Sequence, residues 1–348
     1  MMRYFARRVI NSVLVMAGVI VLVFFLFQGF GDPSRLVLGQ TADKQTQENI
    51  RRELHLDQPK WKQFILYVND VSPISIHSES EIKSKDLTGI FIGGQKKLAF
   101  KLPYLRRSYQ SNRKVGEILM NALPGTLLLA FAAMLIAVCV GIPLGVIAAI
   151  KKDTWIDTTA IVTSILGISA PSFFIGILIA YFFGFVLSEI TGLHMTGNLF
   201  EIDPFKGKTF DLRNLVLPAI TLGIRPLAII AQLTRSAMLD VLNQDYIRTA
   251  RAKGLDEKVV IWKHALRNAL NPVITAVTGW FAELLAGAFF VEYIFGWQGI
   301  GKVTVDALEK LDFPVVMGSV LVSSLFFVII NILADVLYSA TDPRIART

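Results

Sequence analysis

The chain has 348 residues, of which 53% are hydrophobic and 18% charged, with a formal net charge of +8. Its mean hydropathy is +0.53, and its charged share lies below the value of about 25% found in ordinary soluble domains. The composition therefore excludes an ordinary soluble globular domain and predicts an integral membrane protein.

Six apolar segments are long enough to cross a bilayer. A hydrocarbon core about 30 Å thick requires roughly 20 helical residues. Helices are expected because an isolated strand would leave its backbone groups unsatisfied in lipid. Pro171 lies near the middle of the third segment and predicts a kink there, with two shorter spans as the alternative. The predicted spans are residues 9–30, 123–150, 158–187, 215–233, 272–291 and 315–338.

The first apolar run exceeds the 7 to 15 residues of a signal-peptide core, so we interpret residues 1–30 as a retained anchor helix. Residues 31–113 then form a large loop, and residues 114–348 the main body with five further spans. Within the loop, the spacing of apolar side chains predicts a small amphipathic element. Those side chains are Leu54, Trp61, Phe64, Ile65 and Tyr67. The stretch at about 70–112 shows no clear period, and we assign it no function.

Basic residues gather at alternate ends of the spans rather than in one patch, which argues against nucleic acid as the partner. They precede the first span and follow the second, fourth and sixth spans, which are the same side of a six-span protein. By the positive-inside bias, both termini and the loop after the fourth span lie in the cytoplasm. The basic residues of the 31–113 loop do not oppose this orientation, because loops longer than about 60 residues translocate largely regardless of charge.

The loop after the fourth span, at about 240–268, has the pattern of two short helices joined by a turn. Asp245 suits a helix start, and Arg248, Ala250, Arg251 and Lys253 are good helix formers. Gly254 suits a left-handed stop, and Asp256 can begin a second helix that continues through Trp262 and Leu266. Such an element can insert into a cleft on a soluble partner. The alternative is that its charges only attract anionic lipid.

The amino-acid sequence of this loop resembles that of a known protein family. RTARAKG at residues 248–254 and HALRNALNP at residues 264–272 are similar to the cytoplasmic loop of ABC importer permeases, in the form found in the dipeptide, oligopeptide and nickel permease family. Three further blocks agree with this family: EYIFGWQGIG at 292–301, DFPVVMG at 312–318 and DVLYSATDPRI at 335–345.

The resemblance implies an all-α membrane protein with the type I ABC importer fold, six transmembrane helices and a large extracytoplasmic loop. It implies a permease in the bacterial inner membrane whose partners are a second permease of similar fold, two ATPase subunits and an extracytoplasmic binding protein. ATP and Mg²⁺ would be bound by those ATPase subunits, so no catalytic residue and no cofactor is assigned to this chain. The residues it assigns to coupling are Asp245, Arg248, Thr249, Ala250, Arg251, Lys253, Gly254, His264 and Leu266.

Two charged residues fall inside the predicted spans, Arg225 in the fourth and Glu283 in the fifth. A charge at such a depth costs roughly 2.5 to 3.5 kcal/mol, so we expect both to face a water-filled path. Arg225 either pairs with Glu283 or meets an anionic group of the substrate, and a structural ion pair is the alternative. Gly141 and Gly145 have the spacing that lets helices approach closely, and we expect packing there.

Other functional classes have less support. GWQGIGKV at 296–303 nearly spells a phosphate-binding loop, but Val303 replaces the hydroxyl residue that binds Mg²⁺. The four histidines have no metal-ligand spacing, so we assign no metal site. An ion-coupled secondary transporter would show internal repeats and several intramembrane acids, which are not seen here. A nickel or other small-solute permease remains the alternative to a peptide permease, and a scaffold without a solute is a third.

Overall fold

The computed structural model describes residues 2–28, 57–203 and 207–341. Contacts divide the chain into two units, one formed by residues 124–302 and 326–348 and the other by residues 2–123 and 303–325. Two long helices, α6 (Val115–Ile150) and α16 (Phe313–Thr341), contribute one part to each unit. The boundaries expected at residues 30 and 113 follow membrane topology rather than contacts, and they stay a prediction.

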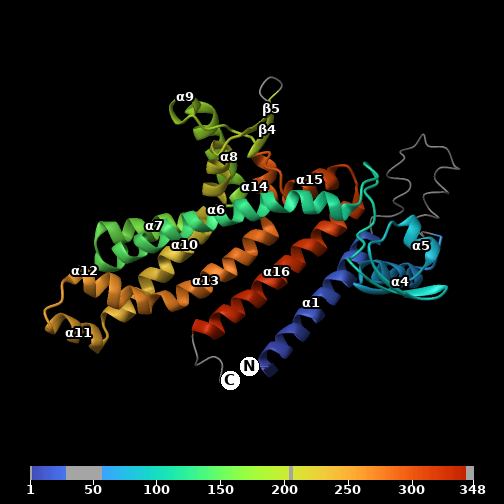
Figure 1. Cartoon of the computed structure of the whole chain (residues 1–348). Coiled ribbons are helices and arrows are strands. Elements are labelled where there is room, and N and C mark those ends of the chain that lie inside the picture. The colour runs from blue at the N-terminus through green and yellow to red at the C-terminus, as the bar shows by residue number, and fades with distance from the viewer. Residues whose placement is uncertain (1, 29–56, 204–206, 342–348) are drawn as a thin grey trace. The chain divides into compact units, whose positions relative to one another are not determined.

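The unit containing the N-terminus consists of helices and one small sheet (Figure 1). Helix α4 packs against α1 through Phe24 and Tyr67, and it contains the amphipathic element that the sequence predicted. Leu54 lies outside the described residues. In chain order the elements are α1 (Met2–Gln28), α4 (Lys60–Val71), β1 (Ile74–Ser78), α5 (Glu79–Ser84), β2 (Gly89–Gly93), β3 (Lys96–Lys101) and most of α15 (Ile300–Glu309).

The sheet of this unit has the order β1-β3-β2, with both pairs antiparallel. It lies in the stretch at 70–112, in which the sequence showed no clear period. Alternation is present in ISIHS and KKLAFK, but apolar residues point to the exposed face and polar residues to the buried one. Such inverted alternation does not match the pattern expected of a strand in a soluble domain.

The second unit is built around α10 (Arg213–Leu242), which packs against α7, α8 and α13. Its core includes the buried side chains of Leu129, Ile230, Phe295 and Trp297. The remaining elements are α7 (Trp155–Ser169), α8 (Ser172–Tyr181), the π-helical turn η1 (Phe182–Val186), α9 (Ser188–Thr191), the hairpin β4 (Phe200–Asp203) and β5 (Gly207–Phe210), α11 (Asp245–Ala252), α12 (Glu257–Val259), the π-helical turn η2 (Val260–Ala265), α13 (Leu266–Gly287) and α14 (Phe289–Ile294).

Helices α6 and α10 approach closely at glycines. A Cβ on Gly141 would lie 2.9 Å from the Leu227 carbonyl oxygen, and one on Gly145 would lie 2.5 Å from the Ala231 carbonyl oxygen. No real Cβ sits that close to a backbone oxygen, so any larger residue would force the helices apart. The packing role expected for this glycine pair is confirmed.

Four described helices are long and apolar enough to cross a membrane: Arg7–Gln28, Val115–Ile150, Arg213–Leu242 and Phe313–Ala334. A fifth candidate is the pair Trp155–Ser169 and Ser172–Val186, which is bent by 106°. The break falls at Pro171, so the predicted kink is confirmed. The predicted fifth span falls in α13, which is not among the candidates found within the described residues. The count of six spans therefore stays a prediction.

Candidate functional site

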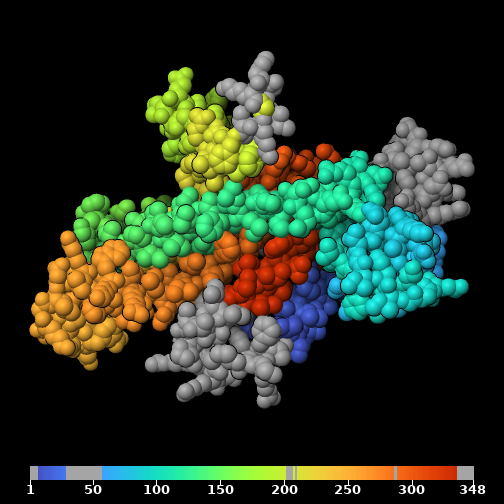
Figure 2. Space-filling view, viewed as in Figure 1, coloured from blue at the N-terminus to red at the C-terminus, as the bar shows by residue number. Residues whose placement is uncertain are grey.

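The charged segment between α10 and α13 folds as two short helical pieces joined by a turn. We call residues 245–265 the elbow. Its first helix, α11, begins at Asp245, the helix start that the sequence predicted. After the turn, α12 starts at Glu257 and continues through the π-helical turn η2 into α13. The elbow is therefore continuous with a long helix of the unit. It forms the protruding orange end of this unit in Figure 2.

The turn of the elbow is set by Gly254, whose φ of +76° is in the left-handed region. The amide of Leu255 donates to the Ala250 carbonyl at 3.4 Å, and the amide of Gly254 donates to the Arg251 carbonyl at 2.9 Å. This pair of hydrogen bonds is a Schellman cap, which satisfies two carbonyls at the end of α11. The left-handed stop predicted at Gly254 is confirmed. Glycine is favoured at this position because of its positive φ. Steric contact is not the reason, since nothing lies within 4 Å of a Cβ placed there.

An ion pair crosses the turn. The Arg251 guanidinium donates to both carboxylate oxygens of Glu257, at 2.7 Å from Nη2 and 3.2 Å from Nε. The hydrogen bond from Arg251 lowers the pKa of Glu257 and the same bond raises the pKa of Arg251. Because both side chains are about half exposed, the pair contributes less than about 1 kcal/mol. The pair joins the end of α11 to the start of α12 across the turn.

The inner face of the elbow is buried in its own unit. Ile247 and Val260 are fully buried and pack with Val146 of α6 and Met238 of α10. Ala250, one of the predicted coupling residues, belongs to this inner face. The predicted residue Leu266, the first residue of α13 directly after the elbow, is buried in the same cluster. These side chains seat the elbow on α6 and α10.

The outer face of the elbow combines basic and apolar side chains. Arg248, Thr249 and Lys253 are exposed, as the sequence suggested, while His264 is half-buried. Four large apolar side chains are also exposed on the same segment, a feature that sequence reasoning missed: Tyr246, Leu255, Val259 and Trp262. Tyr246 and Val259 each stand one position before a buried residue, which turns them about 100° away from the buried face of the helix, and this offset was the available signal. Exposed apolar side chains grouped among basic ones are typical of a surface that binds another protein.

Arg225 and Glu283 are both exposed on the neighbouring helices α10 and α13. The Arg225 guanidinium lies over the Trp280 ring, 5.9 Å from its centroid. Among the described residues, no ion pair joins Arg225 to Glu283, so the pairing considered from the sequence is not observed. An arginine held on an aromatic face keeps its hydrogen-bond donors available.

Helix α13 carries a polar stripe that the sequence reasoning did not identify. Asn271, Thr275, Gly279 and Glu283 recur every fourth residue and are all exposed. This spacing places them on one face of the helix. A helix of this length that turns polar and small residues outward along one face suits contact with water rather than with lipid.

Glu292 is a buried acid outside the predicted spans. Its carboxylate accepts hydrogen bonds from the Thr126 hydroxyl at 2.7 Å and the Lys302 amide at 3.1 Å. A Cβ on Gly299 or Gly301 would lie within 3.0 Å of this carboxylate. The glycines of GWQGIG therefore make room for Glu292 rather than for a phosphate. Burial raises the pKa of Glu292 to about 7, although these donors oppose the shift.

Comparison with known proteins covers almost the whole chain. The family described as binding-protein-dependent transport system inner membrane component matches residues 141–347, and the corresponding N-terminal family matches residues 1–130. The chain is 37% identical to the probable D,D-dipeptide transport system permease protein of Escherichia coli K12, over 98% of this chain and 96% of that protein. It is 33% identical to the dipeptide transport system permease protein of Alkalihalophilus pseudofirmus, over 99% of both.

A third relative is the glutathione transport system permease protein of Escherichia coli K12, 34% identical over 99% of both chains. Among solved structures, a chain of the inward-facing MetNI methionine ABC transporter superposes with a TM-score of 0.51 at 18% identity. The match covers 65% of this chain and 97% of that chain. It shows the type I ABC importer fold, which confirms the predicted fold class.

Proposed function

The chain belongs to the family of binding-protein-dependent transport system inner membrane components, and on this premise we propose that it is the permease subunit of an ATP-driven importer of short peptides. The relatives that align with nearly its full length are named for the transport of dipeptides, D,D-dipeptides and glutathione. The substrates in these names are all short peptides, so we favour peptides over nickel or other small solutes as the substrate.

We propose that the elbow binds the ATPase subunit and transmits its conformational change to the permease. The observation that supports this role is its construction: a capped turn at Gly254, an ion pair across it, and a buried inner face seated on α6 and α10. The exposed residues Arg248, Thr249 and Lys253, together with Trp262, would contact the ATPase subunit. Ala250 and Leu266 would act from beneath, by holding the elbow on the bundle.

The exposed face shared by α10 and α13 is the proposed translocation surface. Arg225, held over Trp280, offers donors to a peptide carboxylate. Glu283 offers a partner to a peptide amino group, and the polar stripe from Asn271 to Glu283 gives water and peptide groups hydrogen-bond partners along the helix. A second permease of similar fold would complete the path opposite this face.

The remaining partners follow from the same proposal. Two ATPase subunits would bind at the cytoplasmic side, and a substrate-binding protein would deliver the peptide from outside. Both termini and the elbow would lie in the cytoplasm of a bacterial cell. The chain itself would make and break no bond, and ATP and Mg²⁺ would be held by the ATPase subunits.

Site-directed crosslinking tests the coupling role. Cys139 is the only cysteine, so a Cys139→Ala background allows a single cysteine to be placed at will. A bifunctional crosslinker at Lys253→Cys should capture the ATPase subunit in membranes of cells that express the whole transporter. A cysteine at Glu189, exposed on α9, serves as the control and should not capture it. Capture from Glu189 but not from Lys253 would contradict the proposal.

Uptake measurements test the substrate. Cells that carry the intact transporter should accumulate a labelled dipeptide, and cells with an Arg225→Gln permease should accumulate it more slowly. Import of nickel with no import of any peptide would favour the alternative substrate. Uptake by the permease alone, driven by an ion gradient, would contradict the importer itself.

A further inference from the structure

The three-stranded sheet of the N-terminal unit exposes an apolar face. Two cross-strand rows lie on it, Ile74–Phe100–Ile90 and Ile76–Leu98–Ile92, according to the strand register. All six side chains are between 40% and 67% exposed. Cross-strand neighbours on one face are in contact, so these residues form one continuous surface.

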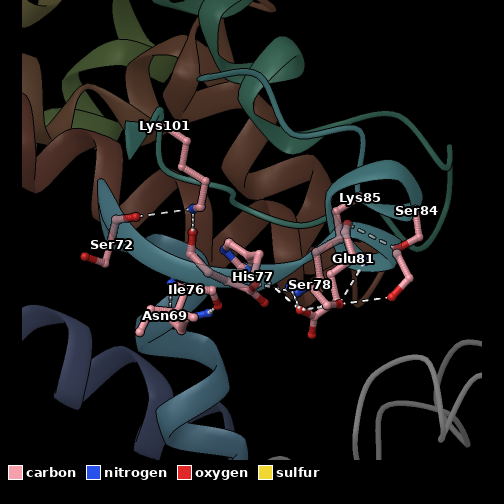
Figure 3. Close-up of polar contacts among 11 residues, drawn as sticks. Asn69, Ser72, Ile76, His77, Ser78, Glu81, Ser84, Lys85 and Lys101 are labelled. Atoms are coloured by element: carbon pink, nitrogen blue, oxygen red, sulfur yellow. Dashed lines mark hydrogen bonds and ion pairs between the residues drawn. The ribbon is translucent and has the colours of Figure 1, made fainter. Parts of the chain in front are cut away.

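The opposite face of the same sheet is buried and polar. Ser75, His77, Ala99 and Lys101 are all buried there. Figure 3 shows how this side is held: the Lys101 ammonium donates to the Ser72 carbonyl at 3.2 Å. A sheet in water has the reverse pattern, with polar residues outward and apolar residues inward. The outer face of this sheet is therefore built for surroundings other than water.

Helix α4 fixes the sheet at one end of the α1 span. Phe24 of α1 packs against Phe64 and Tyr67 of α4, with ring centroids 5.2 and 5.6 Å apart. Phe24 lies in the candidate span Arg7–Gln28, near the end of the apolar run, which in the sequence is followed by Gly31 and Asp32. Because the residues that follow an apolar span lie at the membrane surface, this contact lies near the level of the interface.

The sheet is in turn tied to α4. The Asn69 side chain donates to the Ile76 carbonyl at 2.8 Å and accepts from the Ile76 amide at 3.0 Å. These bonds hold β1 beside the end of α4, as Figures 1 and 3 show. The apolar face of the sheet therefore belongs to a body that is held at the level of the interface by α1.

Exposed side chains on α1 and α4 extend the same apolar character. Phe25 of α1 is exposed and stacks on Phe64 of α4. Trp61 and Ile65, one turn apart on α4, are exposed as well. Tryptophan at this level is typical of the aromatic belt at membrane interfaces. The lipid-facing surface of α1 thus continues onto α4.

We propose that the apolar face of this sheet, formed by Ile74, Ile76, Ile90, Ile92, Leu98 and Phe100, lies in the interface of the outer leaflet. The occupant is lipid rather than protein for two reasons. The face is mainly aliphatic, whereas the centres of protein interfaces are enriched in aromatic residues and arginine. Lys96 of β3, two residues before Leu98 and so on the same face, is an exposed lysine that suits anionic lipid headgroups.

Collision measurements with a nitroxide label test this proposal in the assembled transporter. The label is attached to Ile92→Cys on the Cys139→Ala background, and the complex is placed in vesicles of phosphatidylethanolamine and phosphatidylglycerol. A matched label at Lys83→Cys on α5, whose side chain is 78% exposed, reports the aqueous side of the same subdomain. Both labels replace exposed side chains, so retained ATPase activity of the complex shows that the fold is intact.

At position 92, collisions with oxygen should exceed collisions with a water-soluble nickel chelate, because oxygen concentrates in lipid. At position 83 the nickel chelate should dominate. Dominance of the chelate at position 92 would place the face in water and overturn the proposal. Low collision rates with both reagents would place it against a protein, and spin–spin broadening would place it against a second copy. Either result would also overturn it.

Discussion

Replacement of Gly254 separates the effect of backbone conformation from the effect of side-chain size. Its φ of +76° costs an L-residue roughly 1–2 kcal/mol, yet nothing lies within 4 Å of a new Cβ. Asparagine tolerates this conformation better than alanine, and a β-branched residue tolerates it least. We therefore expect transport to fall in the order Gly254→Asn, Gly254→Ala and Gly254→Val, although asparagine is larger than alanine.

The expected size of the effect follows from the same cost. A penalty of roughly 1–2 kcal/mol reduces the population of the native turn by about five- to thirtyfold relative to its alternatives. In proteoliposomes that contain the whole transporter, Gly254→Val should lower uptake per ATP hydrolysed, while the amount of inserted permease stays unchanged. The assay measures uptake and ATP hydrolysis on the same preparation.

Gly192 supplies the matched control. It has a φ of +65° at the end of α9 and also has nothing within 4 Å of a Cβ. Gly192→Val therefore carries the same backbone strain at a site that we do not assign to coupling, and it should leave uptake per ATP unchanged. Equal uncoupling by the two valine variants would refute the coupling role of Gly254. A ranking by side-chain volume, with asparagine worse than alanine, would refute the conformational reasoning.

Three further substitutions test the interior of the protein. Because folded Glu292 keeps its proton up to about pH 7 while the unfolded chain releases it near 4.5, stability should fall by about 3 kcal/mol as pH rises across that window and then level off. Glu292→Gln should remove this dependence in thermal unfolding scans, and a variant that follows the wild-type profile would exclude Glu292 as its source. Asp157→Asn should lower the free energy of unfolding by about 3 kcal/mol, because the Arg235 guanidinium, which donates to Asp157 at 2.7 Å, loses its charged partner. An unchanged denaturation midpoint would argue against this role of the ion pair. Gly145→Leu should abolish the yield of folded protein, because a larger side chain separates α6 from α10. Gly18→Leu should not, because nothing lies within 4 Å of a Cβ at Gly18. Equal yields of the two variants would contradict the close approach of the helices.

Local features were predictable from neighbouring residues. The start of α11 at Asp245 places an acidic residue in the first turn, where the helix dipole favours it, and the turn at Gly254 uses the freedom of glycine at positive φ, so both depend on a few adjacent residues. The break at Pro171 follows from the missing amide and fixed φ of proline. The spacing of Trp61, Phe64 and Tyr67 predicted a small amphipathic element, which is found in α4, because such a period is visible within one segment.

Contacts between distant segments were not predictable in the same way. Arg225 was expected either to pair with Glu283 or to meet an anionic group of the substrate; the pair is not observed, and the neighbour of Arg225 is Trp280. The glycines of GWQGIG resembled a phosphate loop. Their role, which is to leave room for the Glu292 carboxylate, depends on the fold, because Glu292 is hydrogen-bonded to Thr126, 166 residues away in the sequence. In the sheet, alternation alone could not show that the apolar side faces outward.

The sequence by itself determined the membrane class, the family and the turn of the elbow, because composition, sequence motifs and backbone preferences do not depend on contacts between distant segments. Only the tertiary structure decided which side chains face inward. It buried Ala250 and left Trp262 exposed, and it turned the sheet so that Ile92 lies outside and His77 inside. The physical reason is that burial depends on which elements pack together, and that choice is made by the whole chain rather than by any one segment.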